Sequence, residues 1–205
     1  RVGNGSTPAR ENASYWQDGD IPWMNSSKIN EVFITGTDQF VTKKAIQECH
    51  LPLVPAGSVL IAITGEGRTR GLSAITGIDT TINQHLAYVS VTRGRVLPEY
   101  MRYYLEGQYE HLRYESSGTG STRAALTCGF IQKYPMPVPP FGEQQDIVDA
   151  LNRDLSRLAG LVENAEAMQR LLLERRSALI SAAVTGKLDL RNWQPPEPEA
   201  VAEVV

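Results

Sequence analysis

The pattern of apolar and polar positions divides the chain into two differently built parts. In the first 140 residues, short runs of β-branched and apolar residues alternate with glycine, proline and other turn residues, which is typical of strands. The runs 31–34, 58–64 and 86–92 are expected to be strands. Residues 59–63 are all apolar, so this run is expected at the centre of a sheet.

One helix is expected to interrupt these strands. Pro98 suits a first helical position, and apolar residues follow it at helical spacing to about residue 115. Five tyrosines fall on this segment, at positions 100, 103, 104, 109 and 114. They could stack on bases, but the simpler expectation is that Tyr104 packs in the core and the others lie half exposed.

The second part, from residue 142 to residue 184, repeats apolar residues at a spacing near 3.5, as in a coiled-coil seam. The predicted seam positions for a partner helix are Ile147, Leu151, Leu155, Leu158, Val162, Met168, Leu172 and Leu179, with Ala165 and Arg176 in the same rhythm. The prolines of 135–140 prevent a helix before it, and Gly186 suits its C-terminal stop. These 43 residues would form a helix of about 65 Å whose apolar stripe needs a partner helix.

The expected fold is therefore α+β, with a mixed, twisted sheet and a few helices followed by one long helix. We expect a globular head over 1–140, a spacer and dimerisation helix over 141–190, and a disordered acidic, proline-containing tail over 191–205.

The net charge of −3 is unevenly distributed along the chain. Residues 1–140 contain 13 basic and 12 acidic residues, whereas residues 141–205 contain 7 and 11. The acidity thus belongs to the helix and tail, and a near-neutral head remains compatible with nucleic-acid binding. No apolar run approaches the 18 residues of a membrane span. Cys49 and Cys128 have no metal-site spacing and cannot build a disulfide framework, so a cytoplasmic location is expected.

Signals for catalysis are weak. The glycine-rich segment 65–71 lacks the spacing of a dinucleotide or phosphate loop. Residues 138–141 resemble an amino-methyltransferase motif, but Val138 stands where that motif needs a polar residue. His50, His85 and His111 have no metal-ligand spacing and are expected to be surface or hydrogen-bonded residues.

Signals for binding are stronger. Two glycine-flanked loops combine arginine with small hydroxyl residues, and an amide pair lies between them in the sequence. These candidate DNA-binding residues are Arg68, Thr69, Arg70, Asn83, Gln84, Thr119, Ser121, Thr122 and Arg123. Arginine can bond two atoms of guanine at once, and amides can do the same with adenine. Ordinary solvated loops are the alternative, and the amide pair could equally serve a turn or the core.

The order of several motifs resembles a known family. The motifs are GSTPAR at 5–10, GDIPWM at 19–24, PAGSVL at 55–60, the amide pair 83–84, PMPVPP at 135–140 with EQ at 143–144, LERRSALI at 173–180 and AVTGKLD at 183–189. Together they are similar to the specificity (S) subunits of Type I restriction–modification systems.

The resemblance implies different roles for the head and the helix of this chain. In that family a target-recognition domain reads one half of a split DNA target, and a helix acts as a ruler. A full S subunit has two such domains and two helices packed antiparallel, whereas this sequence has one of each and begins inside the first motif. We therefore expect a half subunit, either natural or cut from a longer chain, that dimerises through its helix, so that a second copy provides the missing partner.

The resemblance also implies partners and roles for residues. Arg68, Arg70 and Arg123 would contact bases in double-stranded DNA, while Lys28 and Lys133, with Lys43 and Lys44, would touch phosphates. Methyltransferase (M) subunits would methylate adenine N6 with S-adenosylmethionine, and a restriction (R) subunit using ATP and Mg²⁺ could join them. This chain would bind no cofactor and catalyse no reaction. Two alternatives remain open: a methyltransferase fragment, and a coiled-coil adaptor whose head binds protein.

Overall fold

The computed structural model describes residues 1–65, 67–91, 94–117, 124–191 and 193–194. The chain divides into two units, Arg1–Leu151 and Asn152–Val205. The first unit extends beyond the expected boundary at residue 140, because the start of the long helix packs on the head. In the described residues, no helix combines the length and apolar character that a bilayer span requires.

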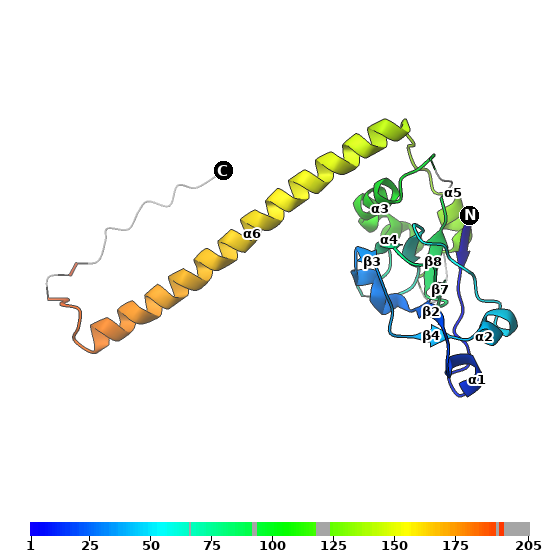
Figure 1. Ribbon diagram of the computed structural model, residues 1–205. Coiled ribbons are helices and arrows are strands. Elements are labelled where there is room, and N and C mark those ends of the chain that lie inside the picture. Colours follow the sequence, from blue (N-terminus) through cyan, green and yellow to red (C-terminus); the bar gives the residue numbers. More distant parts are fainter. Residues whose placement is uncertain (66, 92–93, 118–123, 192, 195–205) are drawn as a thin grey trace. The chain divides into compact units, whose positions relative to one another are not determined.

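A five-stranded mixed sheet forms the centre of the head (Figure 1). Its strand order is β1 (Val2–Asn4), β8 (Leu86–Val89), β5 (Val59–Ala62), β6 (Ser73–Thr76) and β3 (Phe33–Ile34). All neighbours are antiparallel except β6 and β3, which are parallel. Every residue of β5 is buried, which confirms the prediction of a central strand with apolar side chains on both faces.

A smaller sheet lies in the same unit. Its strand order is β4 (Phe40–Val41), β2 (Ile21–Met24) and β7 (Thr81–Ile82). The two short helices α1 (Ala13–Trp16) and α2 (Lys43–Glu48) pack against each other, and the 3₁₀ helix η1 (Ser26–Asn30) follows β2. Trp23 of β2 and Val41 of β4 are central to a separate apolar cluster here.

The predicted helix over 98–115 is present but divided. Helix α3 (Pro98–Gly107) begins at the expected proline, and α4 (Tyr109–Ser117) follows it. Gln108 between them has ψ near 6°, outside the helical range, next to Gly107, a poor helix former. The tyrosine expectation was wrong in detail. Tyr100 is the buried ring, Tyr104 is half-buried and Tyr114 is exposed.

The long helix is confirmed. After the short helix α5 (Cys128–Lys133), helix α6 (Phe141–Val184) starts directly after two prolines and runs unbroken (Figure 1). Gly186 follows its end with φ of 70°, the left-handed conformation that glycine adopts at helix C-termini. The α+β class and the long C-terminal helix agree with the sequence analysis.

Candidate nucleic-acid interface

Three loops of the head meet at one edge of the five-stranded sheet. Strands β1 and β5 each run antiparallel to β8, which lies between them. The carboxyl ends of β1 and β5 therefore lie beside the start of β8, as the pairs Asn4–Ala87 and Ala62–Leu86 show. This register brings the segments 5–10, 63–65, 67–71 and 83–85 to the same edge, which we call the loop edge.

A string of polar side chains connects the three loops. Thr7 donates its hydroxyl to Oε1 of Gln84, and Nε2 of Gln84 lies 3.2 Å from Nε2 of His85. Nδ1 of His85 lies 2.7 Å from the hydroxyl of Thr64, directly before the glycine-rich loop. The sequence analysis singled out Gln84 but missed Thr7, its hydrogen-bond partner, and Thr64, which contacts His85. It expected His85 to be a surface or hydrogen-bonded residue, which is where the structure places it.

Gly5 allows the first loop to approach the sheet closely. A Cβ at this position would lie 1.7 Å from the carbonyl oxygen of Ile82, so no other residue fits without moving the backbone. The next amide, of Ser6, donates to the same oxygen at 3.1 Å. Glycine is thus required here by a close approach of two main chains.

Two indoles hold the remainder of the first loop. Nε1 of Trp23 donates to the carbonyl of Ser6, and Nε1 of Trp16 donates to that of Ala9. The guanidinium carbon of Arg10 lies 3.9 Å from the ring centre of Trp16, and the same side chain donates to Gln39 at 2.7 Å. Stacking and hydrogen bonding therefore order this loop before any ligand binds.

Side chains of α4 donate hydrogen bonds to the backbone of the glycine-rich loop. The hydroxyl of Tyr109 donates to the carbonyl of Arg68 at 2.7 Å, and Nη1 of Arg113 donates to that of Arg70 at 3.1 Å. The Arg68 side chain itself is exposed, and Thr69 is half-buried. The loop backbone is thus fixed while Arg68 points to solvent.

Arg70, expected to read bases, has a different placement. Its side chain is only 4% exposed, and its Nη2 donates to the hydroxyl of Ser117 at 3.1 Å. A guanidinium buried among main-chain and hydroxyl acceptors is not presented to a groove. In this structure Arg70 ties the loop to α4, a long-range contact that composition could not reveal.

The two candidate amide residues, Asn83 and Gln84, differ in exposure. Asn83 is 5% exposed, and its Oδ1 accepts the amide of His85, which is the turn role held open as an alternative. Gln84 is exposed and lies in the polar string. Only the second amide is placed to meet a ligand at the surface.

The candidate phosphate-binding lysines lie on separate elements. Lys28 of η1 pairs with Glu31 at 3.0 Å, and that hydrogen bond raises the pKa of the lysine. Lys133 is exposed at the end of α5, while Lys43 and Lys44 are exposed in the first turn of α2. The four lysines thus come from three different elements.

The second candidate loop cannot be placed. Thr119, Ser121, Thr122 and Arg123 lie outside the residues that the structure describes. Their expected role in DNA binding stays a prediction.

The junction between the head and the long helix is held by a buried amide. Gln144 is fully buried, and its Oε1 accepts the amide of Leu97 at 2.9 Å. Its Nε2 donates to the carbonyls of Arg95 at 3.0 Å and Pro139 at 2.8 Å. One side chain therefore joins the first turn of α6 to the start of α3 and to the proline segment.

Tyrosines hold the proline segment from the other side. Tyr100 donates its hydroxyl to the carbonyl of Pro137 at 3.0 Å, and Tyr104 donates to that of Pro135 at 2.9 Å. Burial raises the pKa of the Tyr100 hydroxyl, so it remains a donor at neutral pH. Tyr100 and Tyr104 of α3 thus serve the junction rather than a base-stacking surface.

The remainder of α6 exposes its apolar side chains, whereas the head buries most of its own. The predicted seam residues from Leu151 to Leu179 are all exposed, with exposed fractions such as 56% for Leu158 and 64% for Met168. Ile147 is half-buried because the adjacent Val148 packs on the head. The seam is an apolar surface that the chain does not cover by itself.

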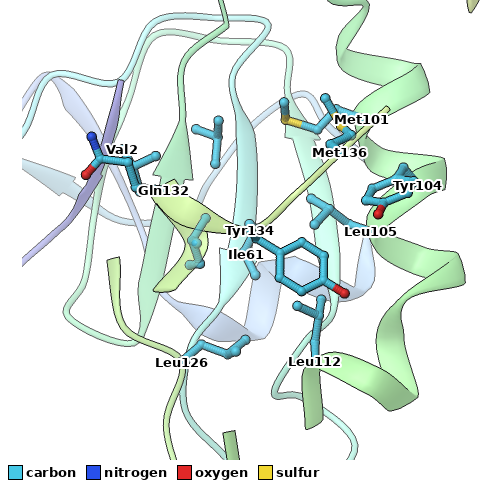
Figure 2. Close-up of a pocket in the computed structure, with 12 residues that line it drawn as sticks. Val2, Ile61, Met101, Tyr104, Leu105, Leu112, Leu126, Gln132, Tyr134 and Met136 are labelled. Carbon is cyan, nitrogen blue, oxygen red and sulfur yellow. The ribbon is translucent and has the colours of Figure 1, made fainter. Parts of the chain in front are cut away.

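An apolar cavity of about 180 Å³ lies among β5, β8 and the helices α3 to α5 (Figure 2). It is lined by Val2, Ile61, Val89, Met101, Tyr104, Leu105, Leu112, Leu126, Ile131, Gln132, Tyr134 and Met136. The hydroxyls of Tyr104 and Tyr134 are bonded to Pro135 and Gln108. None of the described residues that line it carries a charge that could pair with the charged groups of S-adenosylmethionine. Among the described residues, no cluster of three or more histidine, cysteine or acidic side chains could hold a metal ion.

The sequence matches a family model described as the Type I restriction modification DNA specificity domain, over residues 1–160. Similar proteins include the EcoR124I/EcoR124II specificity subunit of Escherichia coli, 24% identical over 73% of this chain and 37% of its own length. The MjaIX specificity subunit of Methanocaldococcus jannaschii is 28% identical over 83% of this chain and 38% of its own length.

Solved structures show the same fold. A chain from a study of complex assembly and conformational transition of the type I R-M system superposes with a TM-score of 0.64 at 21% identity, over 89% of this chain and 42% of that one. The HsdS subunit from Thermoanaerobacter tengcongensis gives 0.58 at 20% identity, over 78% and 36%. This chain thus spans well under half the length of these relatives.

The family match confirms, at the level of the family, the expectation of a specificity component rather than a catalytic one. It also accounts for the weakness of every catalytic motif in the sequence. The chain belongs to the family of Type I restriction–modification DNA specificity domains.

Proposed function

We propose that this chain reads one half of a bipartite DNA target through the loop edge. The observation that supports this most is that the backbone of these loops is anchored while two side chains that can recognise bases are exposed. Three loops are anchored to the sheet, to indoles and to α4, while Arg68 and Gln84 remain exposed. Arginine and amide side chains recognise base edges, and a rigid backbone makes such recognition selective.

The target is double-stranded DNA, and we expect positively charged partners to share the phosphate contacts. The head has nearly equal numbers of basic and acidic residues, and its exposed lysines come from several elements. Binding by phosphate neutralisation alone needs many such contacts. Lys43, Lys44 and Lys133 are then auxiliary contacts, and Lys28 is already paired with Glu31.

In this proposal the chain docks partner subunits and performs no chemistry. M subunits bind S-adenosylmethionine and methylate adenine N6, and an R subunit, where present, uses ATP and Mg²⁺. The described residues that line the apolar cavity of the head include no charged group for such a cofactor, which is compatible with this division. The relatives whose names describe specificity subunits support it as well.

We further propose that two copies associate through α6. The helix exposes a row of large apolar side chains over most of its length, which is unfavourable in water unless another helix covers them. A two-fold dimer would present two identical heads and so read an inverted repeat with a fixed gap.

The test is to map N6-methyladenine in a host genome with and without this chain. Removal is expected to abolish methylation at one bipartite motif, and the intact chain is expected to restore it. If every bipartite motif is unchanged, the chain does not specify methylation. Retained complex formation with no DNA binding at any salt concentration would instead favour a protein-binding adaptor.

A further inference from the structure

The polar string at the loop edge has a direction. An amide nitrogen can only donate, so Nε2 of His85 accepts from Nε2 of Gln84 across their 3.2 Å contact. The imidazole is then neutral with its proton on Nδ1, and this proton is donated to the hydroxyl of Thr64 at 2.7 Å. Since Thr7 donates to Oε1 of Gln84, every hydrogen bond of the string points from the first loop to the glycine-rich loop.

The main chain of His85 is fixed on both sides. Its amide donates to Oδ1 of the buried Asn83 at 3.1 Å, and its carbonyl accepts the amide of Ile63 at 3.0 Å. Thr64, which contacts the imidazole, directly follows Ile63 in the sequence. The edge of the sheet therefore determines where the imidazole lies between Gln84 and Thr64.

The Gln84 amide keeps one donor and one acceptor position for a ligand. An amide group can accept two hydrogen bonds and donate two. Among the residues that the structure describes, this amide contacts only Thr7 and His85, which use one position of each kind. The side chain is exposed, so the remaining two positions can meet a base. Adenine is the only base whose major-groove edge has a donor, N6, beside an acceptor, N7.

We propose that His85 is a positioning residue that orients the Gln84 amide, so that Gln84 selects adenine at one position of the half-site. This inference rests on the proposed reading of DNA through the loop edge. The hydroxyl of Thr7 can donate or accept, so by itself it would let the amide turn over and exchange the two atoms that meet the base. His85 opposes this, because its unprotonated Nε2 would then face Oε1. Reversal needs a rotated amide and a new tautomer of His85 at once.

The test measures binding of the chain with its M subunit to duplexes that carry each base pair at each half-site position. The original chain is expected to prefer adenine at one position by about tenfold or more, and Gln84→Leu is expected to remove this preference. His85→Glu has only acceptors and is expected to keep the preference within about threefold, although its charge weakens binding to every duplex. His85→Lys has only donors, which turn the amide over, and is expected to reduce the preference below about threefold while binding every duplex more tightly.

A second pair of variants repeats the test without a change of charge. Thr64→Val removes the hydroxyl that accepts from Nδ1 and is expected to lower the adenine preference about threefold or more. Thr64→Ser keeps the hydroxyl and is expected to keep the preference. Thermal unfolding of the head is compared in all variants and is expected to stay unchanged, since these side chains lie at the surface or are half-buried.

Three results would overturn the inference. Equal adenine preference in His85→Glu and His85→Lys would remove the orienting role of His85, and equal preference in Thr64→Val and Thr64→Ser would remove the string as its cause. An unchanged preference in Gln84→Leu would show that this amide does not read the base. Each of these leaves the proposed function intact while binding remains sequence-selective, whereas an original complex that binds all duplexes equally contradicts the proposed function itself.

Discussion

The head and the long helix satisfy their side chains in opposite ways. The head buries polar groups such as Arg70 and Asn83 and provides hydrogen-bond partners for them within its own fold. Helix α6 instead exposes leucine and valine side chains along most of its length. The head thus satisfies its buried polar groups within its own fold, whereas the helix presents an apolar face suited to a partner helix.

The largest expected effect concerns the helix. Leu155→Glu together with Val162→Glu places four carboxylates in the seam of the dimer, and dimerisation is expected to weaken more than 1000-fold, or by at least about 4 kcal/mol. The thermal unfolding of the head should stay unchanged. Light scattering measures the mass, and Leu171→Glu, an exposed position outside the predicted seam, serves as the control. An unchanged mass in the double variant would contradict the role of the seam.

The next effect concerns the head alone. Gly5→Ala drives a methyl group into the carbonyl of Ile82 and is expected to lower the free energy of unfolding by about 3 kcal/mol or more. Gly36→Ala is the matched control, since an added Cβ there meets nothing within 4 Å. Denaturant unfolding compares the two variants. Equal stabilities would mean that the loop edge is not anchored at Gly5.

The third effect concerns the junction between the head and α6. Gln144→Leu leaves the amide of Leu97 and the carbonyls of Arg95 and Pro139 without this partner, at an expected cost of about 2–4 kcal/mol in unfolding free energy. Gln145→Leu alters an exposed residue bonded only within the helix, and should change stability by less than about 0.5 kcal/mol. Similar unfolding curves for both variants would show that the buried amide contributes little.

The smallest effect concerns recognition. Arg68→Ala is expected to weaken binding by about 1–3 kcal/mol at one base position while leaving assembly with the M subunit unchanged. The same is expected of Arg123→Ala. Binding to a panel of single-base variants of the target measures this. Equal loss on every sequence would make the residue a phosphate contact, and Arg70→Ala should reduce stability instead.

Features set by local pattern were predictable from the sequence. The apolar run that became β5 and the seam of α6 follow from periodicity, and the stop at Gly186 follows from helix-capping preferences. The break at Gln108 was missed, because helical spacing continues across it.

Features set by long-range contacts were not predictable. Arg70 and Arg68 belong to one glycine-flanked motif, yet one is buried against α4 and the other is exposed. Thr7 and Gln84 lie 77 positions apart, and only the antiparallel register of β1 and β8 brings them together. Composition identified the residue types of the candidate site, whereas tertiary structure decided which of them reach the surface.

The symmetry of the methylated target tests the central claim most directly. In cells where this chain is the sole specificity subunit beside its M subunit, N6-methyladenine mapping is expected to find one inverted repeat, with identical half-sites and a single gap length. That result follows from two identical heads related by the two-fold axis of the proposed dimer. A methylated motif with two different half-sites, or one without a gap, would contradict it.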